Sequence, residues 1–132
     1  MPQELAQRPA PALASCTPLA WPTLSDAQAA QLERVFKALA DRHRVRILNL
    51  LARASEPLCV CDLVDSLGLK QPAVSYHLKQ LVDAGLLARQ RRGTYSYYQL
   101  APGALDQCAT LLGGPAARAL EQPGRVGTVL AG

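Results

Sequence analysis

A pair of short helices in the middle of the chain constrains the fold more than any other feature. An apolar helix is predicted from about Cys61 to Leu67, and Gly68 supplies the left-handed cap that ends it. Shortly afterwards Pro72 stands at a first helical position, where its fixed φ favours helix initiation, and Gly85 ends the second helix. The connecting turn has the length that a helix-turn-helix motif needs.

Further helices and a hairpin surround this pair. Ser25 and Gln28 have the spacing of a capping box and precede an apolar pattern of helical period. A second helix is predicted over 42–53, and a last helix over about 103–112. Between them, 86–91 and 95–100 alternate in polarity around a Gly-Thr turn, which indicates a β-hairpin. The inward-facing residues expected on the 42–53 and 103–112 helices are Val45, Leu48, Leu51, Ala52, Leu105, Cys108, Ala109 and Leu112. The predicted fold is mainly α with a β-hairpin wing, a winged helix-turn-helix.

The chain has the length of one domain with two loose ends. Residues 1–24 are rich in Pro and Ala and show no periodicity, so we expect a flexible N-terminal arm that carries Cys16. Residues 25–112 form the folded unit. Residues 113–132 begin with Gly-Gly-Pro and are expected to be a flexible C-terminal tail.

Charge is concentrated in the predicted helix-turn-helix region. Between Arg34 and Arg92 there are 11 Lys and Arg residues against 5 Asp and Glu, in a chain of net charge +4. A basic stripe on a small domain is typical of nucleic-acid binding, although charge of this kind also serves solubility alone. No apolar run is long enough for a membrane span and no secretory leader is visible, which favours a cytoplasmic protein without a membrane partner. Thiols stay reduced there, so the four cysteines favour metal binding or redox chemistry over a disulfide framework.

Several segments, in the same order, resemble the ArsR/SmtB family of metal-responsive repressors over about residues 30–100. The matching segments are Phe36-Lys37-Ala38-Leu39-Ala40-Asp41, Arg44-Val45-Arg46-Ile47-Leu48, Leu58-Cys59-Val60-Cys61-Asp62-Leu63, Gln71-Pro72-Ala73-Val74-Ser75-Tyr76-His77-Leu78 and Asp83-Ala84-Gly85-Leu86-Leu87. The resemblance implies a homodimer joined through its first and last helices. It also implies binding to a pseudo-palindromic operator in double-stranded DNA and release when an ion binds.

The chain departs from the family pattern at three positions. Arg42 replaces a common Pro at the start of a helix, and Lys70 stands where Ser or Thr often caps the DNA-reading helix. Arsenite-sensing members often carry Cys-x-Cys-x-x-Cys, and here Val64 occupies the third position. The motif therefore supplies two sulfurs, whereas trigonal arsenite or antimonite takes three.

We predict a metal site made of Cys59 and Cys61 with Cys16 as the third thiolate, supplied within or between protomers. Residues two apart in a regular helix point about 200° from each other, so we expect a bound ion to hold the start of this helix in a non-helical form. Cys108 is a possible extra ligand, which would suit cadmium or lead, or alternatively a residue of the dimer interface. The alternative for Cys59 and Cys61 is simple burial, and for Cys16 a dispensable thiol. The last helix holds no His, which excludes a His-carboxylate zinc site there.

The second helix of the motif is expected to enter the major groove of DNA. Gln71, Ser75 and His77 match family positions at this surface, and Gln and Ser can hydrogen-bond to base edges. For His77, which borders the apolar stripe, the alternative is a packed and hydrogen-bonded ring. The further candidate DNA-contacting residues, whose alternative is a solvated surface, are Tyr76, Lys79, Arg89, Arg91, Arg92 and Tyr95.

Other functions are less consistent with the sequence. A thiol enzyme is disfavoured because the chain lacks Cys-x-x-Cys, a nucleotide-binding Gly loop and an acid/base cluster, and no organic cofactor is expected. A thiol redox repressor and a constitutive DNA-binding protein remain open.

Overall fold

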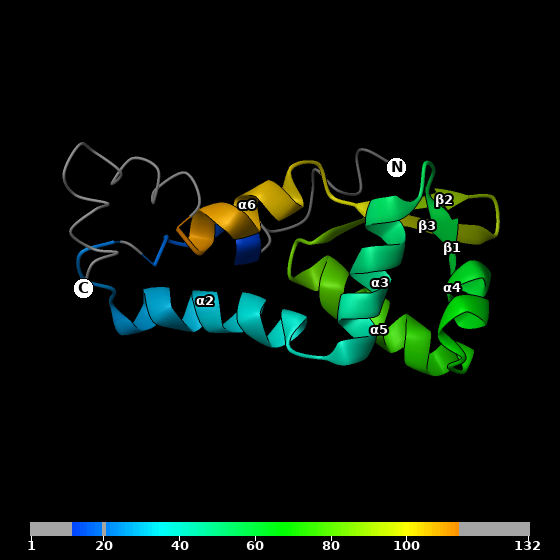
Figure 1. The fold of residues 1–132 in the computed structure, drawn as a ribbon, viewed down its shortest axis with the longest axis horizontal. Helices are drawn as coiled ribbons and strands as arrows, with labels where there is room; N and C mark the ends of the chain where they lie inside the picture. The colour runs from blue at the N-terminus through cyan, green and yellow to red at the C-terminus, as the bar shows by residue number, and fades with distance from the viewer. Residues whose placement is uncertain (1–11, 20, 114–132) are drawn as a thin grey trace, which may run out of the picture.

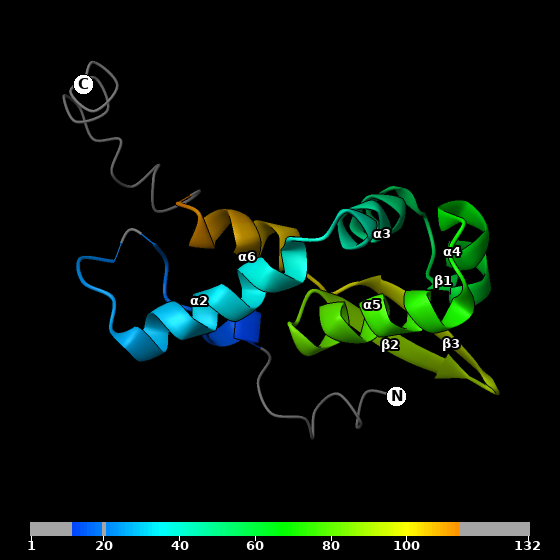
Figure 2. The same cartoon turned by 90° about the horizontal axis from the view of Figure 1, so that it is seen from below.

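The computed structural model describes residues 12–19 and 21–113 of the chain of 132 residues. In chain order the elements are η1 (Ala12–Ser15), α2 (Asp26–Leu39), α3 (Arg42–Arg53), β1 (Leu58–Cys59), α4 (Val60–Leu67), α5 (Gln71–Asp83), β2 (Leu87–Arg92), β3 (Tyr95–Leu100) and α6 (Ala104–Leu111). Helices α2 and α6 lie side by side with η1 at one end of the molecule, whereas α3, α4, α5 and the sheet lie at the other (Figures 1 and 2).

The three strands form an antiparallel sheet in the order β1-β3-β2, and β2 and β3 make the wing. The short strand β1 leads directly into α4, and this connection joins the sheet to the helix-turn-helix. The order of elements confirms the predicted winged helix-turn-helix.

Local signals in the sequence define the helix ends as expected. The Ser25 hydroxyl accepts from the backbone N–H of Gln28, whose side chain accepts in return from the N–H of Ser25, and this closes the predicted capping box. Gly68 ends α4 with a φ of 70°, a left-handed conformation that glycine adopts without strain. Lys70 makes no side-chain capping bond at the start of α5.

The core differs from the predicted stripe on α3. Ile47 is fully buried there with Leu48 and Leu51, whereas Val45 is 53% exposed and Ala52 is also exposed. Val45 precedes Ile47 by two residues and therefore points about 200° away from it around the helix. The expectation that Val45 and Ala52 face inward was wrong.

The predicted stripe on the last helix also needs correction. Ala104 and Leu111 are buried and Cys108 is half-buried, whereas Leu105, Ala109 and Leu112 are exposed. The buried residues recur at helical spacing on the side that contacts η1. In one protomer, the predicted apolar face is therefore largely an outer face.

Part of the expected N-terminal arm packs against the folded unit. Leu13 of η1 is buried in the core, and its backbone N–H donates to the carbonyl of Ala84 at 3.1 Å. Further along, the N–H of Leu19 donates to the carbonyl of Leu111 at 3.0 Å. Residues 1–11 of the arm and 114–132 of the predicted tail lie outside the described residues. No helix in the described part of the chain is long and apolar enough to cross a membrane.

Candidate metal centre and nucleic-acid interface

Cys59, Cys61 and Asp62 come together where β1 passes into α4. Their ligand atoms all lie within 4.8 Å of one another. Cys59 is the N-cap of α4: its Sγ accepts from the backbone N–H of Asp62 at 3.4 Å, and the Asp62 carboxylate accepts from the N–H of Cys59 at 3.1 Å. Cys59 is buried, whereas Cys61 and Asp62 are exposed. Two sulfurs and one carboxylate are thus available to a thiophilic ion.

The two sulfurs meet without any unwinding of the helix, contrary to the expectation from helical spacing. Cys59 has an extended backbone (φ −85°, ψ 168°) and lies outside α4, which begins at Val60, one residue earlier than predicted. The helical angle of 200° therefore does not apply to this pair. The sulfurs of Cys59 and Cys61 form a disulfide in the structure, whereas we expected free thiols. Only the reduced pair could serve as ligands for an ion, because metal binding requires thiolates.

Cys16 and Cys108 form a separate group of thiols at the other end of the molecule. Cys16 directly follows η1, which contacts α6, the helix of Cys108, and both lie far from α4 (Figures 1 and 2). Burial raises the pKa of both thiols, and the negative charge of the Cys16 thiolate raises the pKa of Cys108 further. Arg34 acts in the opposite direction on the pKa of Cys16. Within one protomer, the structure does not bring Cys16 to Cys59 and Cys61.

Asp62 was missed in the sequence as a candidate ligand. The signal was available, because an acidic residue three positions after an N-cap lies back over the cap. Here the cap is itself a cysteine, and the same geometry brings the carboxylate to the sulfur.

Helix α4 packs directly on α5, the predicted DNA-reading helix. Leu63 and Leu67 of α4 are buried in one apolar cluster with Val74 and Leu78 of α5. A shift at the start of α4 is therefore transmitted to α5 through close-packed side chains, which accommodate small displacements poorly.

The outer face of α5 presents four of the predicted DNA-contacting residues to solvent. Gln71, Ser75, Tyr76 and Lys79 are exposed. The Lys79 ammonium lies 2.8 Å from a carboxylate oxygen of Asp83, and this ion pair joins residues one helical turn apart. These side chains form a polar surface that carries donors and acceptors.

His77 lies at the edge of this face and is directed toward α3. Its Nδ1 lies 3.0 Å from a guanidinium nitrogen of Arg44, and its ring centroid is 5.7 Å from that of His43. Burial lowers the pKa of His77, Arg44 and His43 act in the same direction, and Asp41 opposes them. Arg44 was not predicted as a functional residue, because its side-chain partners are backbone carbonyls and a histidine 33 residues away.

The wing carries its arginines in different environments. Arg91 and Arg92 are exposed near the hairpin tip, and the Arg92 guanidinium lies 4.8 Å from the centre of the Tyr97 ring in a cation–π contact. Tyr95, which pairs with Arg92 across the strands, is 63% exposed. Arg89 is half-buried and lies opposite the buried Tyr98 across the two strands. Opposite residues of an antiparallel pair share one face of the sheet, so Arg89 belongs to the face that covers the core.

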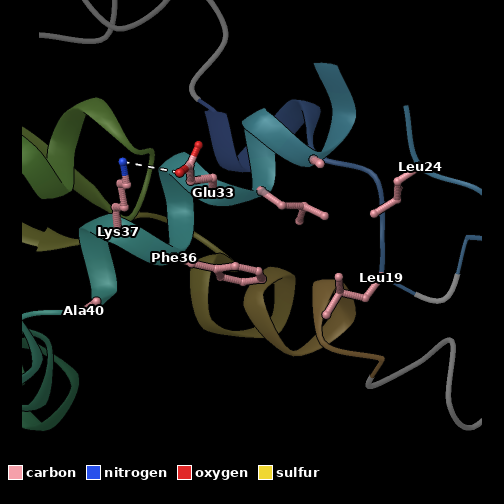
Figure 3. Close-up of a pocket in the computed structure, with 8 residues that line it drawn as sticks. Leu19, Leu24, Glu33, Phe36, Lys37 and Ala40 are labelled. Atoms are coloured by element: carbon pink, nitrogen blue, oxygen red, sulfur yellow. Dashed lines mark ion pairs between the residues drawn. The ribbon is translucent and has the colours of Figure 1, made fainter. Parts of the chain in front are cut away.

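An apolar groove runs between α2 and the segment that precedes it. Its lining includes Leu19, Leu24, Leu32 and Phe36, and an ion pair between Lys37 and Glu33 stands at its edge (Figure 3). Exposed apolar side chains on α6 and on the segment before α2 add to this end of the molecule, among them Trp21, Leu105 and Leu112.

Comparison with known proteins identifies the family. Residues 41–89 match the model of bacterial regulatory proteins of the arsR family. The chain is 38% identical over 76 residues to an arsenical resistance operon repressor of Staphylococcus aureus, over 58% of this chain and 71% of that protein. The chain belongs to the ArsR family.

Another relative within the ArsR family is more similar over a shorter part of its length. An arsenic resistance transcriptional regulator of Pseudomonas putida, ArsR1, is 52% identical over 68 residues. The match covers 52% of this chain and 52% of that protein, so the chain spans about half of that protein's length. Both relatives are named as regulators of gene expression and neither as an enzyme.

A solved structure supports the fold assignment. The homodimeric winged helix-turn-helix domain of a possible ArsR-family regulator from Mycobacterium bovis is 33% identical, with a TM-score of 0.55. The match covers 76% of this chain and 94% of that domain.

Proposed function

We propose that this ArsR-family protein is a homodimeric transcriptional repressor that binds operator DNA in the cytoplasm and releases it when arsenite or antimonite binds its thiolates. The observation that carries the proposal is the Cys59–Cys61 pair at the start of α4, a helix that packs through Leu63 and Leu67 on the buried face of α5. The arsenical resistance names of two relatives support the choice of ion.

The DNA-binding surface consists of the outer face of α5 and the wing. Gln71 and Ser75 would contact base edges, because they are exposed near the start of α5 and carry short hydrogen-bonding groups. Phosphate contacts would come from the exposed cations and from the tyrosines beside them. These residues are Tyr76, Lys79, Arg91, Arg92 and Tyr95. The half-buried Arg89 would support them from the inner face of the wing.

The dimer would form through α2, α6 and the segment that precedes α2. This end of each protomer exposes Trp21, Leu105 and Leu112 beside an apolar groove, and such a surface is costly to leave in water. The homodimeric state of the Mycobacterium bovis domain supports the formation of a dimer.

The third thiolate would come from Cys16 of the opposite protomer. In its own protomer, Cys16 lies beside α6 and far from α4, whereas trigonal arsenite takes three sulfurs and Cys59 and Cys61 supply two. Each site would then join the dimer end of one protomer to the helix-turn-helix of the other, and it would pull on α4 when it closes. A coupling free energy of about 1–3 kcal/mol would lower operator affinity about 5–150-fold.

The test measures fluorescence anisotropy of a labelled duplex that reduced wild-type protein has enriched from a random pool. Stoichiometric arsenite should release the duplex, and Cys59→Ser, Cys61→Ser and Cys16→Ser should each prevent release at the same concentration. Cys108→Ser is the matched control and should respond like the wild type. Dependence on Cys108, with release by cadmium or lead alone, would instead assign the site to those ions.

Mixed dimers test which protomer supplies Cys16. A dimer of one Cys16→Ser chain and one Cys59→Ser/Cys61→Ser chain retains a single complete site only if ligation crosses the interface. Release of DNA by arsenite from this mixed dimer, and not from either parent, is the expected result. No release from the mixed dimer would contradict ligation between protomers.

A redox-controlled repressor is the second candidate, favoured by the Cys59–Cys61 disulfide. Hydrogen peroxide would oxidise the two thiols to the disulfide and would itself be reduced to two waters. In that case hydrogen peroxide alone would release the duplex, dithiothreitol would restore binding, and arsenite would have no effect on the reduced protein.

A further inference from the structure

The Arg44 side chain joins three helices through its hydrogen bonds. Its Nε donates to the carbonyl of Ala38 at 2.7 Å, and one terminal nitrogen donates to the carbonyl of Lys37 at 3.2 Å. The other terminal nitrogen lies 3.0 Å from Nδ1 of His77 on α5. Arg44 itself is fixed at the start of α3, because its backbone N–H donates to the Asp41 carboxylate at 3.1 Å.

The acceptors on α2 belong to its last turn. Carbonyls in the last turn of a helix lack the usual partner four residues further on, and the carbonyl of Lys37 accepts from the backbone N–H of Ala40 at 3.3 Å instead. The Arg44 guanidinium adds a second donor to that carbonyl and supplies a donor to the carbonyl of Ala38. Arg44 therefore ties the C-terminal end of α2 to α3, and the same planar group continues to α5. The fork-like donor geometry of arginine is suited to such a bridge, whereas a lysine ammonium is not.

The contact with His77 requires one protonation state of the imidazole. Arginine offers only donors, so Nδ1 of His77 has to accept, and the ring proton then sits on Nε2. Burial lowers the pKa of His77, and Arg44 and His43 lower it further, whereas Asp41 opposes them. On α5 itself, the ring of Tyr76 meets the His77 ring edge-on, with the two centroids 5.5 Å apart. The neutral ring thus dominates at neutral pH.

His77 shares a rigid helix with the exposed residues that are proposed to read DNA. It lies two positions after Ser75 and directly after Tyr76, so a rotation of α5 about its own axis would move all three together. The hydrogen bond from Arg44 is directed sideways from α5 and resists such a rotation. All three nitrogens of the Arg44 guanidinium already have partners within the protein, so this residue is unsuited to a phosphate contact.

We propose that Arg44 is a positioning residue which, through His77, fixes the rotation of α5 against the C-terminal end of α2. Since α2 is also the proposed dimer helix, the bond sets how the two α5 helices of a dimer are spaced and oriented on the half-sites of an operator. The proposal rests on the DNA-binding function above. It assigns His77 to the scaffold beneath the DNA-contacting surface rather than to a base contact.

The first experiment measures how strictly the protein requires one half-site spacing. The probes are the duplex enriched by the wild type and the same duplex with one base pair inserted between the half-sites. Arg44→Lys keeps the charge but loses the fork, so its preference for the original spacing should fall about tenfold or more, with affinity for random DNA unchanged. Arg46→Lys is the matched control, because Arg46 lies on the same helix and donates to the carbonyl of Ser66 instead.

The second experiment varies the pH, because an arginine with a merely structural role would cause no pH dependence of the spacing preference. The spacing preference of the wild type should decline as the pH falls through the pKa of His77, since a protonated ring cannot accept from Arg44. His77→Gln offers a side-chain oxygen that accepts at every pH, so its preference should stay constant over the same range. Nitrogen chemical shifts of His77 report independently whether Nδ1 accepts, and this signature should be lost in Arg44→Lys.

The outcomes separate this inference from the proposed function. If the wild type fails to prefer the enriched duplex over random DNA, the DNA-binding function itself is wrong. If the wild type shows that preference and folded, dimeric Arg44→Lys retains the same spacing requirement, the positioning role is wrong. A pH dependence that persists unchanged in His77→Gln would also overturn it.

Discussion

Removal of the two exposed arginines at the wing tip should weaken the salt dependence of DNA binding by a calculable amount. Arg91 and Arg92 are exposed, and Arg92 is held over the Tyr97 ring, so both are available to phosphates at little conformational cost. Each neutralised phosphate contributes about 0.9 to the slope of log affinity against log salt concentration. Two arginines in each of two protomers therefore contribute about 3.6 to the slope of a dimer.

The assay compares wild type and Arg91→Gln/Arg92→Gln by anisotropy between 50 and 200 mM salt. Over this fourfold range a slope difference of about 3.6 means that the wild type loses roughly 150-fold more affinity than the variant. Both enriched and random duplexes should show the effect, because phosphate contacts carry no sequence information. Arg42→Gln/Arg53→Gln removes the same charge from exposed positions of α3 and serves as the control.

An unchanged slope in the wing variant would contradict phosphate contacts by the wing, as would an equal decrease in the α3 control. The first result would place the wing away from the phosphates. The second would mean that only the net charge of the protein matters.

Three further predictions concern stability. Ile47→Ala should lower the free energy of unfolding by about 2–5 kcal/mol in urea titrations, whereas Val45→Ala, on the exposed side of α3, should change it by at most about 0.5 kcal/mol; similar losses would contradict the assigned core. Gly68→Ala should cost about 1–2 kcal/mol because of the left-handed φ of 70°, although nothing lies within 4 Å of the added carbon, and an unchanged urea midpoint would count against this. Because the pKa of His77 is lowered on folding, the unfolded chain binds a proton first, so stability should fall as the pH drops below about 6.5 toward the folded-state pKa. His77→Gln should show a shallower fall in urea midpoint between pH 7.5 and 5, and an identical fall would exclude a role of His77 in it.

Features that depend on neighbouring residues in the sequence were predictable. The capping box at Ser25, the left-handed cap at Gly68 and the hairpin between β2 and β3 were all predicted correctly. Each results from backbone hydrogen bonds or steric limits within a few residues. The order of these local elements was enough to predict a winged helix-turn-helix.

Features that depend on packing were predicted less well. The inner face of α3 is centred on Ile47 rather than Val45, and α6 buries Ala104 and Leu111 rather than Leu105 and Leu112. An apolar period gives the candidate faces of a helix, but the neighbouring elements decide which of them is buried. On α6 the exposed set also suits a second protomer, which the pattern of one chain does not distinguish from its own core.

The identity and order of the helices, and the two thiols one residue apart before the predicted DNA-reading helix, could be read from the residues alone, because they follow from local geometry and residue chemistry. Which groups meet depends on the packing of the fold. It placed Cys59 outside α4 so that its sulfur reaches Cys61, placed Cys16 near α6, and joined Arg44 to His77 across 33 residues. Such contacts depend on how the elements pack in space, and spacing along the chain carries no information about them.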